Sequence, residues 1–592
     1  MNRKRLLLTC YGAVLISMVG LAPATAANRP VTVATVEPRV WELVQTEGQA
    51  RVLVYLLGQA DLQPAYGLTD WTERGQFVYG QLQALQRGSG DLYAWLEKSN
   101  ARPHRLLTAN AVAADVGAGL LAALARRPEV WRIGPNAPAG LVEVPDVSGQ
   151  SPRPATARPV RGTAEAVEWN IAKIGADLAW ADFGVRGQGV VVGDIGTGVM
   201  VEHAALVQQY RGNLGSGVFD HNYNWFDIVD GWPAPFDDNG HSTFGVGVAI
   251  GDDGGANQIG VAPAAKWIAV KALDNGSATL EDLHAAMEWM LAPTDLNGAN
   301  PDPAKRPNVG LNMWGLWGGC DPEFSLDVQA WQAAGILPVF AIGSEGPGCS
   351  LIRSPADMVG TFTAGATDMD DDISGFSARG PSCWGPLKPE VSAPGVNIRS
   401  STNDGGYDVW SGTSFAAAHL AGAAALVLSA DPSLNLDDLT AIVKETAVCR
   451  EDLTCGGSPC PEGMNNVYGW GRIDAYEAVA AAWGGLPPMH VSRIRLTARD
   501  RSSGKYVLQG AVRVLDETLH PVEEAAVSVE WAYPDASIVL QEALTGLTGT
   551  ARFRLQSRQW GVHQLCVTAI AKAGWRYDPS QNVETCEATT VP

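Results

Sequence analysis

Positive charge is scarce in this chain of 592 residues. Lysine and arginine together number 42 against 63 aspartates and glutamates, so the formal net charge is −21. A surface that binds a nucleic-acid duplex must be basic, because binding displaces the counterions of the phosphates. The composition therefore argues against nucleic acid or an anionic membrane as a partner, and it favours solubility.

Long apolar runs are missing from the chain after its first residues. The run Leu6 to Val19 follows the basic stretch Asn2-Arg3-Lys4-Arg5 and precedes Ala24-Thr25-Ala26, an arrangement typical of a secretory signal peptide. We expect residues 1–26 to be removed and the protein to be secreted to the extracellular space. Later segments fall short of the roughly 18 uncharged apolar residues of a membrane span, so no such span is expected.

Cysteines are also few. There are nine, and Cys10 lies inside the predicted signal peptide, so its removal leaves eight. An even number in an oxidising compartment favours disulfides over metal ligation. Cys566 and Cys586 are the predicted pair, and the sequence leaves the connectivity of the other six open. These are Cys320, Cys349, Cys383, Cys449, Cys455 and Cys460. No contiguous oxygen-ligand loop stands out, so no metal site is predicted.

The texture of the sequence divides the chain into several parts, and its length is enough for about three or four domains. Residues 27–145 alternate strand and helix patterns and predict an α+β unit. Residues 146–166 are rich in Pro, Ser, Ala and Arg, which is typical of an exposed linker. Strands alternate with helices over 167–483, and this predicts an α/β domain with a doubly wound parallel sheet. Period-two apolar runs over 484–592 predict an immunoglobulin-like β-sandwich.

One stretch carries the pattern of a catalytic nucleophile. Ser414 lies between small residues and is followed by an apolar run that reaches Leu428. This predicts a serine on the first turn of a buried helix, where unpaired amides and the helix dipole favour negative charge. The alternative is that Ser414 only caps a core helix.

Two more motifs precede this serine. Asp194 ends the β-branched run that begins at Val190, and a buried parallel strand would deliver its carboxylate at the carboxyl edge of a sheet. His241 follows Gly240 and opens a helix of small residues. The chain order Asp, His, Ser is that of subtilisin. With these motifs the chain resembles the subtilisin-like serine peptidases, or subtilases, and most of all secreted subtilases of the bacillopeptidase F type.

The resemblance implies roles for these residues. Ser414 would attack the scissile carbonyl, His241 would take its proton, and Asp194 would orient the imidazole. Ser344 and the amide of Ser414 would stabilise the oxyanion, although the family usually has Asn in place of Ser344. Two segments would flank an extended peptide: Met313-Trp314-Gly315, where the family usually has Ser in place of Met313, and Gly276-Ser277-Ala278.

The resemblance has further implications. Residues 27–145 would be a propeptide that assists folding and inhibits the enzyme until it is removed. Calcium is common in the family and is a possible cofactor by resemblance alone. Four departures from the usual pattern surround the catalytic motifs, at positions predicted to serve packing. They are Ser242, Phe244, Phe415 and Ala418.

Several alternatives remain open at this point. The leading hypothesis is a secreted serine endopeptidase that acts on polypeptides, with its own propeptide as inhibitor. The rival is a binding or surface protein on a subtilase fold that has lost turnover, which Ser344 would favour. Residues 27–145 could instead form an unrelated binding domain, and the C-terminal domain could either bind a surface or add stability.

Overall fold

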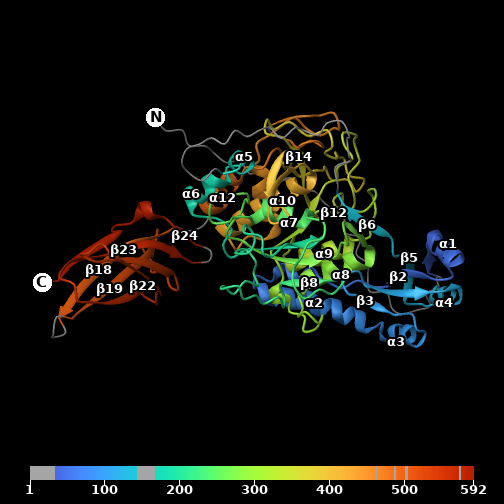
Figure 1. Ribbon diagram of the computed structural model, residues 1–592, viewed down its shortest axis with the longest axis horizontal. Helices are drawn as coiled ribbons and strands as arrows, with labels where there is room; N and C mark the ends of the chain where they lie inside the picture. Colours follow the sequence, from blue (N-terminus) through green and yellow to red (C-terminus); the bar gives the residue numbers. More distant parts are fainter. Residues whose placement is uncertain are drawn as a thin grey trace.

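The computed structural model describes residues 34–142, 167–460, 463–485, 488–500, 505–572 and 575–591 (Figure 1). The predicted signal peptide, 1–26, and the predicted linker, 146–166, lie outside the described residues. The described chain forms an N-terminal α+β unit, a central α/β unit and a C-terminal all-β unit.

The N-terminal unit is built on a five-stranded sheet of order β1-β5-β2-β4-β3. The strands are β1 (Thr35–Val36), β2 (Ala50–Leu56), β3 (His104–Leu106), β4 (Ala111–Val116) and β5 (Val130–Pro135). The helices are α1 (Pro38–Glu47), α2 (Trp71–Arg87), α3 (Gly90–Lys98) and α4 (Ala118–Leu124). The expected alternation of strand and helix patterns is present in this unit, and α1 and the short strands β1 and β3 add to it.

The alternating side chains of β2 explain how this unit is held. Val52 and Val54 face a core that α1, α3 and α4 cover. Leu53 and Tyr55 face the opposite way and share a core with α2 and with two helices of the central unit. Because successive residues of a strand point to opposite faces, a single strand contributes to both cores.

The central unit contains a seven-stranded sheet whose neighbouring strands are all parallel. Its order is β15-β14-β13-β11-β7-β9-β8. The bounds are β7 (Val191–Gly196), β8 (Trp225–Asp227), β9 (Lys266–Lys271), β11 (Val309–Asn312), β13 (Leu337–Ala341), β14 (Phe362–Thr367) and β15 (Val391–Pro394). The predicted doubly wound parallel sheet is confirmed.

Helices cover both faces of this sheet. On one face α7 (His241–Ile250), α10 (Thr413–Ala430) and α12 (Ala475–Gly485) pack in one apolar core. On the other face α8 (Leu280–Leu291) and α9 (Ser325–Ala334) pack between the sheet and the N-terminal unit. Every residue of α7 is buried, and so is every residue of α10 except Ser429, which is why both sequences are apolar almost all round.

A small sheet joins the N-terminal unit to the central one. Its middle strand, β6 (Pro138–Leu141), is the last strand before the undescribed segment 143–166. It pairs antiparallel with β10 (Ser277–Thr279) on one side and β12 (Trp314–Gly315) on the other. Figure 1 shows β6 and β12 side by side at the edge of the central unit.

Two four-stranded sheets form the C-terminal unit, drawn in red in Figure 1. Their orders are β22-β19-β18-β24 and β21-β20-β23-β25. The strands are β18 (Pro488–Asp500), β19 (Tyr506–Asp516), β20 (Ala526–Ala532), β21 (Ile538–Leu544), β22 (Thr550–Ser557), β23 (Gly561–Ala571), β24 (Arg576–Tyr577) and β25 (Cys586–Val591). Both sheets contribute to one apolar core around Trp531.

All eight described cysteines form disulfides. Cys566 pairs with Cys586, as the sequence predicts. The other three bonds are Cys320–Cys383, Cys349–Cys455 and Cys449–Cys460. In the part of the chain that the structure describes, α10 alone is long and apolar enough to cross a membrane, and 89% of its 18-residue window is buried inside the protein. That burial is typical of a core helix.

Candidate active site

Ser414 is the second residue of α10 and is 1% exposed. Gly412, the residue before the helix, has extended backbone with φ 170°. As at any helix start, the first amides of α10 lack the usual acceptor one turn earlier in the helix, and Phe415 N donates instead to Gly412 O at 3.2 Å. This position combines a nucleophile with donors for developing negative charge.

His241 is the first residue of α7, and Asp194 lies near the carboxyl end of β7. His241 and Ser414 line one cavity of 290 Å³ together with Val142. Asp194 borders the first turn of α7, because a Cβ atom on Gly196 would contact both Asp194 Oδ2 (3.1 Å) and Ser242 Oγ. The three predicted residues therefore converge from β7, α7 and α10.

Hydrogen bonds in this group are incomplete. Both carboxylate oxygens of Asp194 and Nδ1 of His241 are buried and lack a hydrogen-bond partner within the described residues. Ser414 Oγ donates to the carbonyl oxygen of Val142 at 3.3 Å. Buried polar atoms without partners are rare in native proteins, so an acceptor and a donor left open at one place indicate a functional site.

Burial sets the protonation of the same residues. It raises the pKa of the Asp194 carboxyl to about 8, and the neighbouring Ser242 offsets part of this rise. Burial also lowers the pKa of the His241 imidazole to about 4. At neutral pH His241 is therefore uncharged and able to accept a proton, as a general base requires.

Ser344 lies beyond the carboxyl end of β13 and is 1% exposed. Its Oγ is 3.3 Å from Oγ1 of Thr413, the residue before the nucleophile. Two hydroxyl donors thus lie at the N-terminal end of α10. The sequence analysis named Ser344 and missed Thr413, whose adjacency to Ser414 was the available signal.

The chain itself occupies the channel between the two predicted peptide-flanking segments. Val142 N donates to Met313 O at 3.3 Å, and Leu141 N donates to Gly276 O at 3.1 Å. Gly140 is in register with both Gly315 and Ser277. An extended segment therefore runs as the middle strand of a sheet and delivers the carbonyl of Val142 to Ser414. The sequence predicted the two peptide-flanking segments, but it did not predict that the chain's own segment lies between them.

The two peptide-flanking segments bind the segment between them through their backbone atoms. The Met313 side chain is 1% exposed and points into the core, where a Cβ on Gly245 of α7 would collide with it. Trp314 is also 1% exposed and packs edge-on against Phe324 and Phe340. The replacement of the usual Ser by Met313 therefore alters core packing and leaves the peptide-facing backbone in place.

The unusual residues near the catalytic motifs pack on one another. Phe244 stacks on Trp410 at 4.5 Å and lies 4.4 Å from Phe415, measured between ring centroids. Phe415 in turn lies 5.8 Å from the ring of His241. Ser242 Oγ accepts a hydrogen bond from Thr197 N at 2.9 Å. Phe244 and Phe415 therefore fill neighbouring space together, which supports the prediction that these two residues serve packing.

No metal role emerges from the described residues. Among them, the one group of three close Cys, His, Asp or Glu ligand atoms is Cys320, Asp357 and Cys383. Its two cysteines are joined in a disulfide, so their sulfur atoms are not available as thiolate ligands. Within the described residues we therefore identify no cluster of side chains for the calcium that the resemblance makes possible.

Comparison with known proteins agrees with this geometry. The Subtilase family profile matches residues 187–471, which contain Asp194, His241, Ser344 and Ser414. Subtilisin Savinase from Lederbergia lenta is 30% identical over 319 residues, and the match covers 53% of this chain and 99% of that protein. The chain belongs to the subtilase family.

Other relatives extend the match. Serine protease AprX from Bacillus subtilis is 31% identical over 327 residues, covering 50% of this subtilase and 67% of AprX. Bacillopeptidase F from the same organism is 38% identical over 433 residues, covering 71% of this subtilase and 29% of that longer protein. Subtilases are serine-type endopeptidases, and this subtilase is an enzyme of that class by family.

Proposed function

We propose that the chain is a secreted serine endopeptidase that hydrolyses peptide bonds through Asp194, His241 and Ser414. The observation that carries the proposal is the contact of 3.3 Å between Ser414 Oγ and the carbonyl oxygen of Val142. A peptide carbonyl at the nucleophile, on a strand held from both sides, is the arrangement from which acyl transfer begins.

The triad works through one proton. Ser414 Oγ attacks the carbonyl carbon while its proton passes to Nε2 of His241, and the imidazolium later gives that proton to the leaving amine. In the catalytic arrangement an ionised Asp194 accepts a hydrogen bond from Nδ1–H of His241 and fixes the tautomer, and this bond would lower the pKa that burial raises to about 8. The two unpaired oxygens of Asp194 and the unpaired Nδ1 of His241 support this pairing.

The oxyanion is stabilised by the amide of Ser414 at the start of α10 and by hydroxyl groups. Ser344 and Thr413 supply two hydroxyls that lie 3.3 Å apart. A hydroxyl is shorter than the asparagine amide usual in the family, so its stabilisation of the transition state is weaker. The enzyme is therefore slower than one that carries the amide.

The substrate of the first cut is the chain itself. We propose cleavage of the Val142–Glu143 bond, after which the unit 34–142 stays bound as an inhibitor with β6 in the substrate channel. The register of β6 with β10 and β12 supports this. Later trimming within 146–168, in the exposed linker predicted from sequence, would complete maturation.

Two measurements test the proposal. Purified mature protein should react at Ser414 with a fluorescent organophosphonate, and the Ser414→Ala variant should not. N-terminal sequencing of the secreted protein should give Glu143 or a start within 146–168. An unlabelled Ser414 together with a stable start near Ala27 would contradict the endopeptidase and leave a subtilase-fold binding protein.

The C-terminal unit, 484–592, is proposed to be an immunoglobulin-like β-sandwich appended to the enzyme. Its two sheets and shared core support a sandwich. Deletion of this unit after Gly485 should leave peptide hydrolysis intact if its role is separate from catalysis.

A further inference from the structure

A buried arginine contacts the peptide segment in the channel. Nη1 of Arg353 donates to the carbonyl oxygen of Leu141 at 3.2 Å. Leu141 directly precedes Val142, the residue whose carbonyl is at Ser414. In the numbering of substrate residues from the scissile bond, Val142 is P1 and Leu141 is P2, so the guanidinium binds the P2 carbonyl.

The backbone of Arg353 is fixed between two strand ends. Its own amide donates to Ile342 O at 3.2 Å, just beyond β13, while Leu316 N, just beyond β12, donates to Ser354 O at 2.8 Å. The side chain passes beneath β12, since a Cβ on Gly315 would lie 3.2 Å from Arg353 Cβ. A side chain anchored in this way loses little freedom when it binds a peptide.

The Arg353 guanidinium is also contacted along its edge by a carboxylate and across its face by an aromatic ring. Arg353 Nε donates to Glu345 Oε1 at 2.6 Å. The Trp317 ring covers the guanidinium, with its centroid 4.6 Å from Cζ. The arginine side chain is 9% exposed, so the P2 carbonyl meets a charged donor that is largely shielded from water. Hydrogen bonds to charged donors are the stronger ones, and shielding from water strengthens them further.

We propose that Arg353 is a substrate-positioning residue, which binds the backbone carbonyl at P2 of every peptide that Ser414 cleaves and is itself oriented by Glu345. This inference rests on the proposed function, because it assumes that substrates follow the path of residues 138–142. A carbonyl is common to all peptides, so the contact adds affinity and register without selecting a side chain.

The contact exists before and during the reaction, so its loss should act mainly on KM. Arg353→Met should raise KM by about tenfold to a hundredfold, the range expected for a hydrogen bond from a charged donor, with a smaller change in kcat. Arg353→Lys should recover part of the loss, because an ammonium can donate to the carbonyl but lacks the planar fork by which the guanidinium also binds Glu345.

A substrate change isolates the contact from general structural damage. Two fluorogenic tetrapeptides are compared, identical except that the P2 carbonyl is either an amide or a thioamide, whose sulfur is a weak acceptor. The wild-type enzyme should discriminate against the thioamide by about tenfold in kcat/KM, and Arg353→Met should not discriminate. Glu345→Gln should discriminate less than the wild type.

Arg379→Met serves as the matched control. Arg379 is a half-buried arginine of the same unit, and its ion pair is with Asp452 at 3.9 Å. This variant should keep the wild-type discrimination. Thermal melting shows whether Arg353→Met is folded. If it is not, the double variant Arg353→Met with Glu345→Gln, which removes both charges, is used in its place.

The outcomes separate the two claims. Equal discrimination against the thioamide in wild type and in a folded Arg353→Met enzyme would overturn the role of Arg353 while leaving the endopeptidase intact. An inert wild type whose Ser414 does not react with the organophosphonate would overturn the proposed function, and the inference with it.

Discussion

The residues at the site act as a set, and their replacement tests that set directly. Ser414→Ala, His241→Ala and the double variant should lose similar amounts of kcat, because members of a triad do not contribute independently. Asp194→Asn should also lose activity strongly, since the wrong imidazole tautomer would be favoured. The measurement is kcat on an unstructured protein. Additive losses in the double variant would argue against a shared mechanism.

Ser344 occupies the position at which the resemblance to subtilases leads us to expect an asparagine. We expect Ser344→Asn to raise kcat by about tenfold to a hundredfold with little change in KM, because the added amide would bind an oxyanion that exists mainly in the transition state. In subtilisin, loss of one such amide lowers kcat by about 10² to 10³. The gain expected here is smaller than that factor, which is taken from subtilisin.

The comparison requires kcat and KM for both forms on one substrate. Thr413→Val is the matched change on the neighbouring hydroxyl and should lower kcat in both backgrounds. An unchanged kcat in Ser344→Asn would mean that another group already fills the position of the asparagine amide.

Among the elements, α10 holds a second buried histidine that links stability to pH. His419 Nδ1 donates to Phe415 O at 2.7 Å, and Asn170 Nδ2 donates to His419 Nε2 at 2.8 Å. Burial lowers the pKa of His419 to about 4 from its usual 6.5. The unfolded chain therefore binds this proton first, so the contribution is complete above pH 6.5 and is lost as pH falls toward 4.

His419→Gln should remove that dependence. The shift corresponds to about 3 kcal/mol of unfolding free energy lost between pH 6.5 and 4, and the variant should lose correspondingly less. Urea unfolding at a series of pH values measures the unfolding free energy of the protein with His419 and of the His419→Gln variant. Both carry Ser414→Ala to prevent self-digestion. His241 contributes a similar dependence in both proteins, so the difference between them reports His419 alone.

Elements with a strong period were predicted well, and those that depend on tertiary contacts were not. The amphipathic period of the sequence predicts a helix over residues 280–291, which are the bounds of α8, and a capping box of Thr279 and Asp282 fixes its start. In contrast β6 is Pro-Ala-Gly-Leu, which has no strand period, and it becomes a strand only between β10 and β12. Tertiary pairing overrode weak local propensity there.

The same distinction holds for the site. Asp194, His241 and Ser414 could be named because each lies in a short local motif that resembles the corresponding motif of subtilases. Arg353 could not, because its function depends on Leu141, which is 212 positions away. A contact of this kind has no signature in local spacing.

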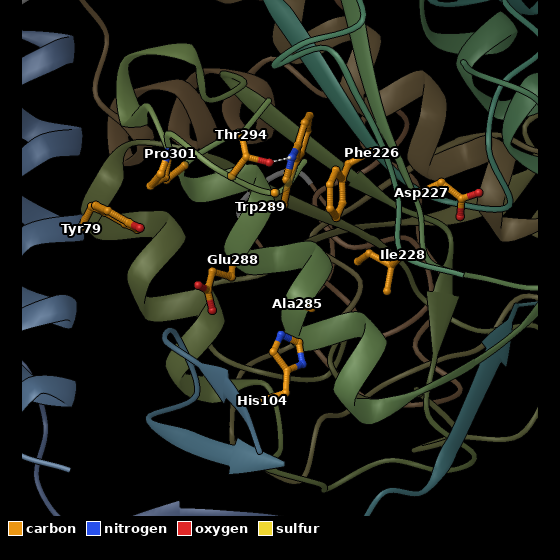
Figure 2. Close-up of a pocket in the computed structure, with 12 residues that line it drawn as sticks. Tyr79, His104, Phe226, Asp227, Ile228, Ala285, Glu288, Trp289, Thr294 and Pro301 are labelled. Atoms are coloured by element: carbon orange, nitrogen blue, oxygen red, sulfur yellow. Dashed lines mark hydrogen bonds between the residues drawn. The ribbon is translucent and has the colours of Figure 1, made fainter. Parts of the chain in front are cut away.

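At the scale of the whole molecule, the N-terminal unit and α8 enclose titratable groups between them. Tyr79 and His104 of the N-terminal unit and Glu288 of α8 line one cavity of 370 Å³. Figure 2 shows their side chains. Leu107 N donates to Glu288 Oε2 at 2.6 Å. Burial raises the pKa of Glu288 to about 7, the Leu107 amide and His104 offset part of this, and Asp327 adds to it.

This arrangement predicts that the N-terminal unit is released more readily as the pH rises from acid to neutral. A carboxyl whose pKa is raised in the complex stabilises the complex below its ordinary pKa of 4.5, and the stabilisation is lost as pH rises through 7. His104, whose pKa is raised by its hydrogen bond to Glu281, changes in the same direction, because its loss of a proton weakens that bond.

We therefore expect the cleaved unit 34–142 to dissociate about fivefold more readily at pH 7 than at pH 6, with only about a twofold further gain at pH 8, and Glu288→Gln to flatten this dependence because an amide cannot ionise. The delay between cleavage at Val142 and the appearance of peptidase activity, measured from pH 6 to 8, reports release. Glu445→Gln, an exposed carboxylate at the end of α11 (Leu436–Glu445), is the control and should keep the wild-type slope. A slope that persists unchanged in Glu288→Gln and is abolished in His104→Gln would assign the dependence to the Glu281 contact, and a slope unchanged in both would separate release from this interface altogether.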